Sequence, residues 1–125
     1  MHACKRILVS WYADPRYIPP FVLSENQVTV GPKSFPDQPP MMFSAWTPQG
    51  VHDLKAALDA ARISGSFDAV VVWADASGIN LPLNLGAFDC PKVLCVGDTQ
   101  HLKAPLSTMI EYSPAACLRL LIMNL

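Results

Sequence analysis

A chain of 125 residues predicts a single domain, long enough to bury a core but with no room for a second lobe. Nine basic and ten acidic residues give a net charge of −1, which excludes the positive field that attracts nucleic acid or an anionic membrane surface. Hydrophobic residues make up 51% of the chain and charged residues 15%, so the composition indicates either a large core or a surface that binds a partner.

The cysteines and the N-terminus indicate the compartment. The four cysteines have no CxxC spacing and three of them lie in or beside apolar runs, which is typical of reduced thiols and predicts a cytoplasmic protein. The apolar run in MHACKRILVSW is too short for a signal peptide. No segment approaches the roughly twenty apolar residues that cross a bilayer, so we expect no membrane partner.

Five apolar runs have the marks of buried strands. They are rich in Val, Ile and Leu and lack polar alternation, as expected when helices cover both faces of a parallel sheet. The sequence therefore predicts an α/β fold, namely a Rossmann-like three-layer domain over residues 1–125 with a mainly parallel sheet of about five strands. In chain order, the runs are residues 6–11, 27–30, 68–75, 92–98 and 118–123.

A proline-rich stretch, GPKSFPDQPPMMFSAWT, separates the second run from Pro48. Its four prolines predict an irregular segment without continuous helix or sheet pairing. A long irregular segment in so small a domain is usually functional or packs against a partner.

Two helices are expected. In TPQGVHDLKAALDAARISG, Thr47 is placed to cap a helix, Pro48 suits its first position, and Gly65 suits the left-handed residue after its end. A second helix is expected to begin at Pro105 and to stop before Pro114. The apolar face of the first helix is expected to contain Val51, Leu54, Leu58 and Ala61.

Polar residues gather where two of the expected strands end. Residues 97–104 form a loop at the carboxyl end of a parallel strand, where open α/β sheets place their binding crevices. Either these side chains contact a ligand, or Asp98 and Thr99 turn the chain and Asp75 caps the following turn. We assign no catalytic residue. The candidate substrate-binding residues that this pattern indicates are Asp98, Thr99, His101, Lys103 and Asp75.

Cofactor and metal signatures are missing from the sequence. The three histidines, His2, His52 and His101, show no metal-ligand spacing, and His52 is expected in the first turn of a helix. The glycines spell neither G-x-G-x-x-G nor a P-loop, so a nucleotide phosphate site of those kinds is not expected. We therefore expect neither a cofactor nor a metal.

The stretch DAVVVWADASGINLPLNLGAFDCPKVLCVGDTQHLKAPLSTMIEY resembles the amino-terminal domain of CgeB-like, spore-maturation-type glycosyltransferases of the GT-B fold. The run GDT-x-HL-x-AP is its distinctive part, and KRILVSWYADPRYIPPF is a weaker likeness. The resemblance implies two Rossmann-like lobes with a cleft between them, the first contacting the acceptor and the second binding the nucleotide-sugar donor. Asp98, Thr99, His101 and Lys103 would face that cleft. Asn80 and Asn84 would shape its rim, so the resemblance adds Asn80 to the candidate substrate-binding residues.

The chain departs from this family because it ends where the donor lobe should begin. The resemblance therefore implies a truncated, acceptor-side domain that binds a sugar acceptor and cannot complete transfer without the missing C-terminal lobe. The alternative is a non-catalytic interaction domain that uses its apolar surface and its proline-rich stretch to form a homo-oligomer.

Overall fold

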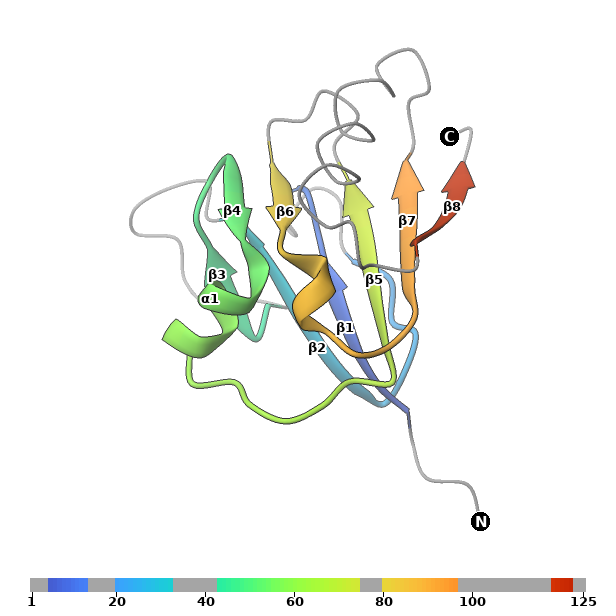
Figure 1. Cartoon of the computed structure of the whole chain (residues 1–125), viewed down its shortest axis with the longest axis horizontal. Helices are drawn as coiled ribbons and strands as arrows, with labels where there is room; N and C mark the ends of the chain where they lie inside the picture. Colours follow the sequence, from blue (N-terminus) through green and yellow to red (C-terminus); the bar gives the residue numbers. More distant parts are fainter. Residues whose placement is uncertain (1–4, 14–19, 33–42, 75–79, 97–117, 123–125) are drawn as a thin grey trace.

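The structure is a computed structural model that describes residues 5–13, 20–32, 43–74, 80–96 and 118–122. These residues form a six-stranded sheet, with a second sheet of two short strands and one short α-helix packed on it (Figure 1). The large sheet contains β1 (Arg6–Ser10), β2 (Asn26–Pro32), β3 (Ala45–Thr47), β5 (Ala69–Ala74), β7 (Lys92–Val96) and β8 (Leu118–Ile122). The remaining elements are β4 (Val51–Asp53), α1 (Leu54–Ala60), β6 (Leu81–Leu83) and the 3-10 turn η1 (Leu85–Ala87).

The large sheet is parallel throughout, and its strand order is β3-β2-β1-β5-β7-β8. The chain winds outward from β1 to β3, crosses back to β5 beside β1, and then winds outward in the other direction. This is the doubly wound arrangement of Rossmann-like domains. The prediction of an α/β fold with a mainly parallel sheet is therefore confirmed, and each of the five expected strands is present within a few residues of its expected ends.

Burial on both faces explains why these strands read as continuous apolar runs. Alternate residues of one strand point to opposite faces, so Val70 and Val72 pack in one cluster while Val71 and Trp73 pack in another. All four side chains are at most 9% exposed. When both faces of a strand are buried, its sequence is apolar throughout and does not alternate between apolar and polar residues.

The first of these faces is covered by α1, β6 and η1. Leu54 and Leu58 of α1, Leu81 of β6 and Leu85 of η1 are each at most 2% exposed and pack in the same cluster as Leu8 of β1. The apolar face expected for the first helix is therefore confirmed at Leu54 and Leu58.

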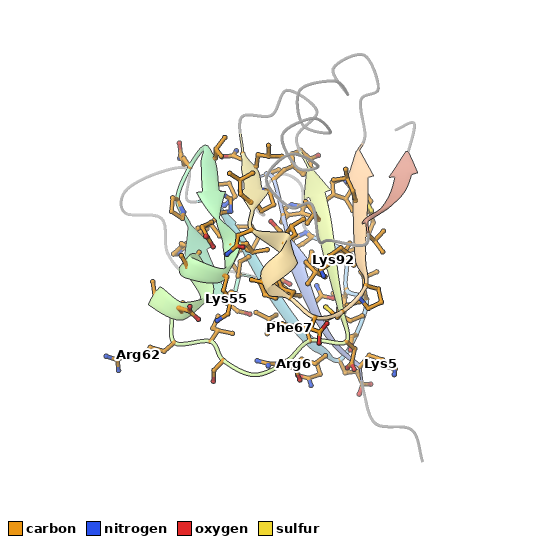
Figure 2. All side chains as sticks on the ribbon, in the orientation of Figure 1. Lys5, Arg6, Lys55, Arg62, Phe67 and Lys92 are labelled. Atoms are coloured by element: carbon orange, nitrogen blue, oxygen red, sulfur yellow. The ribbon has the colours of Figure 1, made fainter. Side chains whose placement is uncertain are left out.

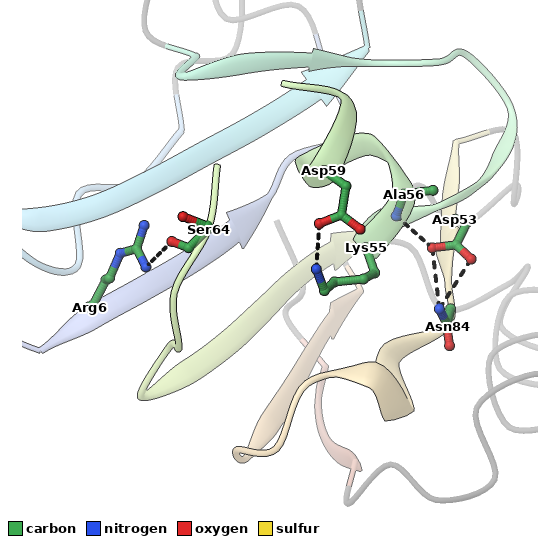
Figure 3. A network of polar contacts seen from close by, with 7 residues as sticks. All are labelled: Arg6, Asp53, Lys55, Ala56, Asp59, Ser64 and Asn84. Atoms are coloured by element: carbon green, nitrogen blue, oxygen red, sulfur yellow. Dashed lines mark hydrogen bonds and ion pairs between the residues drawn. The ribbon is translucent and has the colours of Figure 1, made fainter. Parts of the chain in front are cut away.

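The beginning and the end of α1 differ from the expectation. Thr47 ends β3 instead of capping the helix, and the cap is Asp53, whose carboxylate accepts a hydrogen bond from the Ala56 N–H at 2.9 Å (Figure 3). The expectation was wrong because β4 pairs with β6 and takes up the preceding residues, which leaves Val51 56% exposed. Gly65 does adopt a positive φ of 94°, although α1 has already ended at Ala60. The helix expected after Pro105 lies outside the described residues.

The proline-rich stretch is paired in the described residues at both of its ends, and residues 33–42 between them lie outside the described residues. Pro32 is the last residue of β2, and β3 lies at the edge of the sheet with Thr47 opposite Pro32. Prolines are tolerated at strand ends, and a three-residue edge strand leaves little pattern in a sequence. Phe43 packs directly on Gly31, where a Cβ would lie 2.5 Å from two carbons of the ring.

Arg6 holds the lower end of the β1–β5 pair together. Its backbone N–H donates to the Asp68 carboxylate at 2.8 Å, and its guanidinium donates to the Ser64 carbonyl at 2.7 Å (Figure 3). The guanidinium also lies 4.5 Å from the ring centroid of Phe67, the cation–π neighbour labelled in Figure 2. Arg6 therefore fixes the loop that leads from α1 into β5.

We expect Leu58→Ala to lower the free energy of unfolding by about 2–5 kcal/mol, because it leaves a cavity between α1 and the sheet. Asp59→Ala is the control on the same helix. It removes a 59% exposed side chain and its ion pair with Lys55, and should cost at most about 1 kcal/mol. Urea unfolding of both variants measures the difference, and equal losses would contradict the burial of Leu58.

Gly31→Ala should destabilise the protein by about 1–3 kcal/mol, because the new methyl group meets the Phe43 ring. A smaller side chain at position 43 relieves that clash. The double variant Gly31→Ala/Phe43→Leu should therefore be more stable than the sum of the two single losses predicts, as a double-mutant cycle would measure. Additive losses would show that the two residues do not touch.

Candidate functional site

The strand order places a candidate crevice where the chain reverses between β1 and β5. In open α/β sheets, ligands bind outside the carboxyl ends of the strands at this reversal. β1 ends at Ser10 and is followed by Trp11 and Tyr12, and the arrowheads of β1 and β5 in Figure 1 point to the same edge.

Asn80 joins three segments at this edge. Its Oδ1 accepts a hydrogen bond from the Gly50 N–H at 2.9 Å, and its Nδ2 donates to the Tyr12 carbonyl at 3.4 Å. The side chain thus connects the residues after β1, the turn before β4 and the start of β6. Gly50 has a φ of 88°, a left-handed conformation that favours glycine, so this turn depends on Gly50 as well as on Asn80.

His52 of β4 presents a buried hydrogen-bond acceptor. Its Nδ1 lies 3.0 Å from the Gly50 carbonyl oxygen, and a carbonyl can only accept, so Nδ1 carries the proton and Nε2 keeps its lone pair. Burial lowers the pKa of His52 from its ordinary value of 6.5, against smaller opposing effects of this hydrogen bond and of Asp53, and so favours the neutral ring. The residue is 8% exposed, and Nε2 has no hydrogen-bond partner among the residues that the structure describes.

Thr47 carries the second unpaired polar atom. It is the last residue of β3 and is 5% exposed, and its Oγ1 is buried without a hydrogen-bond partner in the described part of the chain. A buried polar atom left unpaired costs about 1–3 kcal/mol, so native proteins rarely retain one without a reason. We name Tyr12, Thr47, Gly50, His52 and Asn80 the carboxyl-edge cluster.

An aromatic group supports this edge from the opposite face of the sheet. Trp11, which follows β1, lies 5.3 Å from Trp73 of β5 between ring centroids, and Phe21 lies 5.8 Å from Trp11 and 4.9 Å from Trp73. Trp11 and Trp73 are at most 8% exposed, whereas Phe21 is 48% exposed. The rings therefore stiffen the point where the strand order reverses.

Of the residues proposed from the sequence, the structure describes Asn80, which lies at the expected edge of the sheet. Asn84 lies at the opposite end of β6 and donates to the two Asp53 carboxylate oxygens at 3.1 and 3.4 Å, so it links η1 to α1 and does not reach Asn80's end of the strand (Figure 3). Asp75, Asp98, Thr99, His101 and Lys103 lie outside the described residues.

Sequence reasoning missed His52 and Thr47 because both were assigned to a helix start. The signal that could have corrected this is Gly50, since glycine inside a helix costs about 1 kcal/mol relative to alanine and often marks a turn. Pro48 also suits a turn, so TPQG reads equally well as the end of one strand and the start of another.

The described part of the chain holds no group of side chains suited to a metal ion and no helix suited to crossing a membrane. No three or more His, Cys, Asp or Glu side chains there lie close enough together to hold a metal ion. None of the helices described there has the length and apolar character needed to cross a membrane. Comparison of the chain with protein-family models, curated proteins and solved structures gives no match.

His52 should make stability depend on pH. Its pKa in the folded state lies below 6.5, so its contribution is complete above about pH 6.5 and is lost as the pH falls through the folded pKa, because the unfolded chain then binds the proton more readily. We expect the wild-type free energy of unfolding to fall between about pH 7 and about pH 5.

His52→Asn is the matched variant, because the asparagine amide can donate to the Gly50 carbonyl but does not titrate. The difference in unfolding free energy between wild type and this variant should shrink as the pH falls. His2 and His101 are present in both proteins, so their contributions cancel. A constant difference across this range would show that His52 is not desolvated in the folded state.

Proposed function

We propose that this chain is the acceptor-side, Rossmann-like domain of a nucleotide-sugar glycosyltransferase of the GT-B type. In this proposal the carboxyl-edge cluster binds a hydroxyl-bearing acceptor, and transfer requires a donor-binding lobe. Two kinds of support are available: the resemblance of residues 67–112 to the CgeB-like enzymes, and the chemistry of the described carboxyl edge.

The observation that carries the proposal is the pair of unpaired polar atoms at this edge. His52 Nε2 needs a donor, and the Thr47 hydroxyl can donate or accept. The neighbouring hydroxyl groups of a sugar can each donate and accept a hydrogen bond. A site that bonds such hydroxyls is specific, because a ligand without them leaves the polar atoms of the site unpaired. These two atoms match a polyhydroxyl ligand in their hydrogen bonding, and because both are buried, the ligand would have to displace the side chains that cover them.

The residues after β1 favour an acceptor over a dinucleotide. In dinucleotide-binding domains a glycine-rich turn follows this strand, so that the backbone can approach the pyrophosphate. Here Trp11 and Tyr12 occupy that place, with their ring centroids 5.3 Å apart, and Trp11 is 3% exposed. Bulky, packed side chains at this turn leave no close backbone approach for a phosphate.

A second candidate function is a non-catalytic interaction domain. The observation in its favour is a run of three exposed apolar residues, Phe21, Val22 and Leu23, which are 48%, 84% and 52% exposed. Consecutive exposed apolar side chains favour a protein interface. The two functions use different surfaces and can be tested separately.

A titration followed by NMR tests acceptor binding. Glucose, galactose and N-acetylglucosamine are added at millimolar concentration, with UDP-glucose as the donor control. We expect at least one free sugar to shift the backbone amides of Thr47 and Gly50, and UDP-glucose to shift them no more than that sugar does. Amides that stay unmoved by every sugar would contradict the proposal.

Thr47→Val tests the hydroxyl that has no partner. We expect it to weaken sugar binding about two- to tenfold, equivalent to about 0.5–1.5 kcal/mol, while leaving stability unchanged or raised. Thr29→Val is the matched control, because Thr29 is equally buried but its hydroxyl accepts from Gln27 Nε2 at 2.8 Å. That control should lose stability and keep sugar affinity. The reverse pattern would remove Thr47 from the site.

A further inference from the structure

The segment before β2, residues 21–23, is held by one side chain. Gln27 of β2 donates from Nε2 to the Phe21 carbonyl at 2.8 Å, and its Oε1 accepts from the Leu23 N–H at 2.7 Å. Nε2 also donates to the Thr29 hydroxyl at 2.8 Å, which fixes the orientation of the amide. We name residues 21–23 the edge segment.

The amide of Gln27 takes the place of a neighbouring strand. In a parallel sheet, one residue donates its N–H to the carbonyl before its partner residue and accepts from the N–H after it. Gln27 makes this pair of bonds around Val22 with its side chain. In an extended segment, the backbone groups of successive residues point to opposite sides. Since Gln27 bonds the Phe21 carbonyl and the Leu23 N–H, we infer that the N–H and carbonyl of Val22 point away from Gln27.

These outward backbone groups lie on an exposed apolar surface. Val22 is 84% exposed and the described structure gives its backbone no hydrogen bond, so the edge segment behaves as the open edge of a strand. Of the four large apolar residues that are exposed in the described chain, three form this segment, and the fourth is Val51. Phe21 anchors the segment by packing against Trp11 and Trp73.

We propose that the edge segment pairs with the same segment of a second copy of this chain, antiparallel across a two-fold axis at Val22. In an antiparallel sheet, two residues directly opposite each other can exchange both of their N–H···O=C bonds. The single donor and acceptor of Val22 therefore complement those of Val22 in the other copy. Such a contact is self-complementary, as the interface of a two-fold dimer must be.

Charge complementarity favours a second copy over a charged partner. A two-fold axis brings identical residues together, so a charged edge would repel its own copy. The edge segment carries no charge, and Glu25, beyond Ser24, is the nearest charged residue in the described part of the chain. The chain as a whole has a net charge of −1, so repulsion between copies is small.

The pairing is expected to be weak. One exchanged pair of hydrogen bonds and three apolar side chains from each copy fall short of the roughly 1,200 Å² that a stable interface buries. Dimerisation should therefore depend on concentration. This inference supplies the surface for the interaction-domain candidate, on which it rests, and it is independent of acceptor binding at the carboxyl-edge cluster.

Sedimentation equilibrium tests the pairing. Between about 10 µM and about 1 mM, a range suited to a weak interface, the average mass of the wild-type chain should rise from that of one copy toward that of two. Val22→Asp should remain monomeric throughout, because it places two carboxylates at the axis. Val51→Asp changes the other exposed valine and should associate like the wild type.

A backbone measurement separates strand pairing from adhesion between apolar side chains. Exchange of the Val22 amide proton with D₂O should slow at least severalfold from the lowest to the highest concentration, whereas the amide of Val51 should keep one rate. Gln27→Leu leaves the exposed side chains in place but removes both bonds to the edge segment, and should weaken association tenfold or more. Circular dichroism checks that each variant is folded.

These measurements can support or overturn the proposed pairing of two edge segments. A wild-type chain that is monomeric at the highest concentration, or a Val22→Asp variant that still dimerises, would overturn it, as would an unchanged Val22 exchange rate in a dimer. The sugar titration is repeated on Val22→Asp, which keeps the carboxyl-edge cluster intact. Loss of dimerisation and loss of sugar binding are thus scored independently.

Discussion

The pairing of β1 with β5 is the constraint from which the arrangement of this domain follows. The ladder runs from Ile7 opposite Ala69 to Ser10 opposite Val72, and the two strands are far apart in sequence, so the chain must cross the sheet once to bring them together. Each strand then carries its own half of the fold outward. This crossing brings the carboxyl ends of β1 and β5 to the same edge of the sheet. There the Asn80 side chain donates a hydrogen bond to the Tyr12 carbonyl.

The two ends of this central pair differ in how completely their polar groups are bonded. At the amino end, Arg6 and Asp68 exchange backbone and side-chain hydrogen bonds, and Arg6 also bonds the loop carbonyls of Ser64 and Ser66. At the carboxyl end, His52 and Thr47 each retain a buried atom without a partner. The amino end is thus held by several hydrogen bonds, and the proposed binding site lies at the other end, where α/β domains bind ligands.

Secondary structure could be predicted from the sequence for strands that are buried on both faces of the sheet. It could not be predicted for elements of only three residues. Runs such as VVVW in β5 could be recognised because every residue in them is packed, and Leu58 could be assigned to a buried helix face from spacing alone. The strands β3, β4 and β6 have three residues each, too few for a period to show. Thr47 could be read as a helix cap or as the last residue of a strand. Only its pairing with Pro32 in the folded sheet shows that it ends a strand.

The candidate site could be predicted in part for a related reason. The family resemblance pointed to Asn80, and the structure places its side chain at the carboxyl edge, bonded to Gly50 and Tyr12. His52 could not be predicted as a site residue, because what marks it is the unpaired Nε2 acceptor. Whether this atom is paired can be seen only from the contacts of the folded chain. Similarly, no sequence pattern distinguishes Gln27 from any other polar residue at the start of a strand; its place beside Val22 depends on the fold.

The contact between Gly31 and Phe43 has a consequence for how this chain can vary among its relatives. The described residues on either side of positions 33–42 lie close together, since Phe43 packs on Gly31 and Thr47 pairs with Pro32. Lengthening a closed loop costs little, about 0.6 kcal/mol for each doubling. Insertions and deletions should therefore accumulate between Pro32 and Phe43, while the glycine and the aromatic ring that close the loop are retained together.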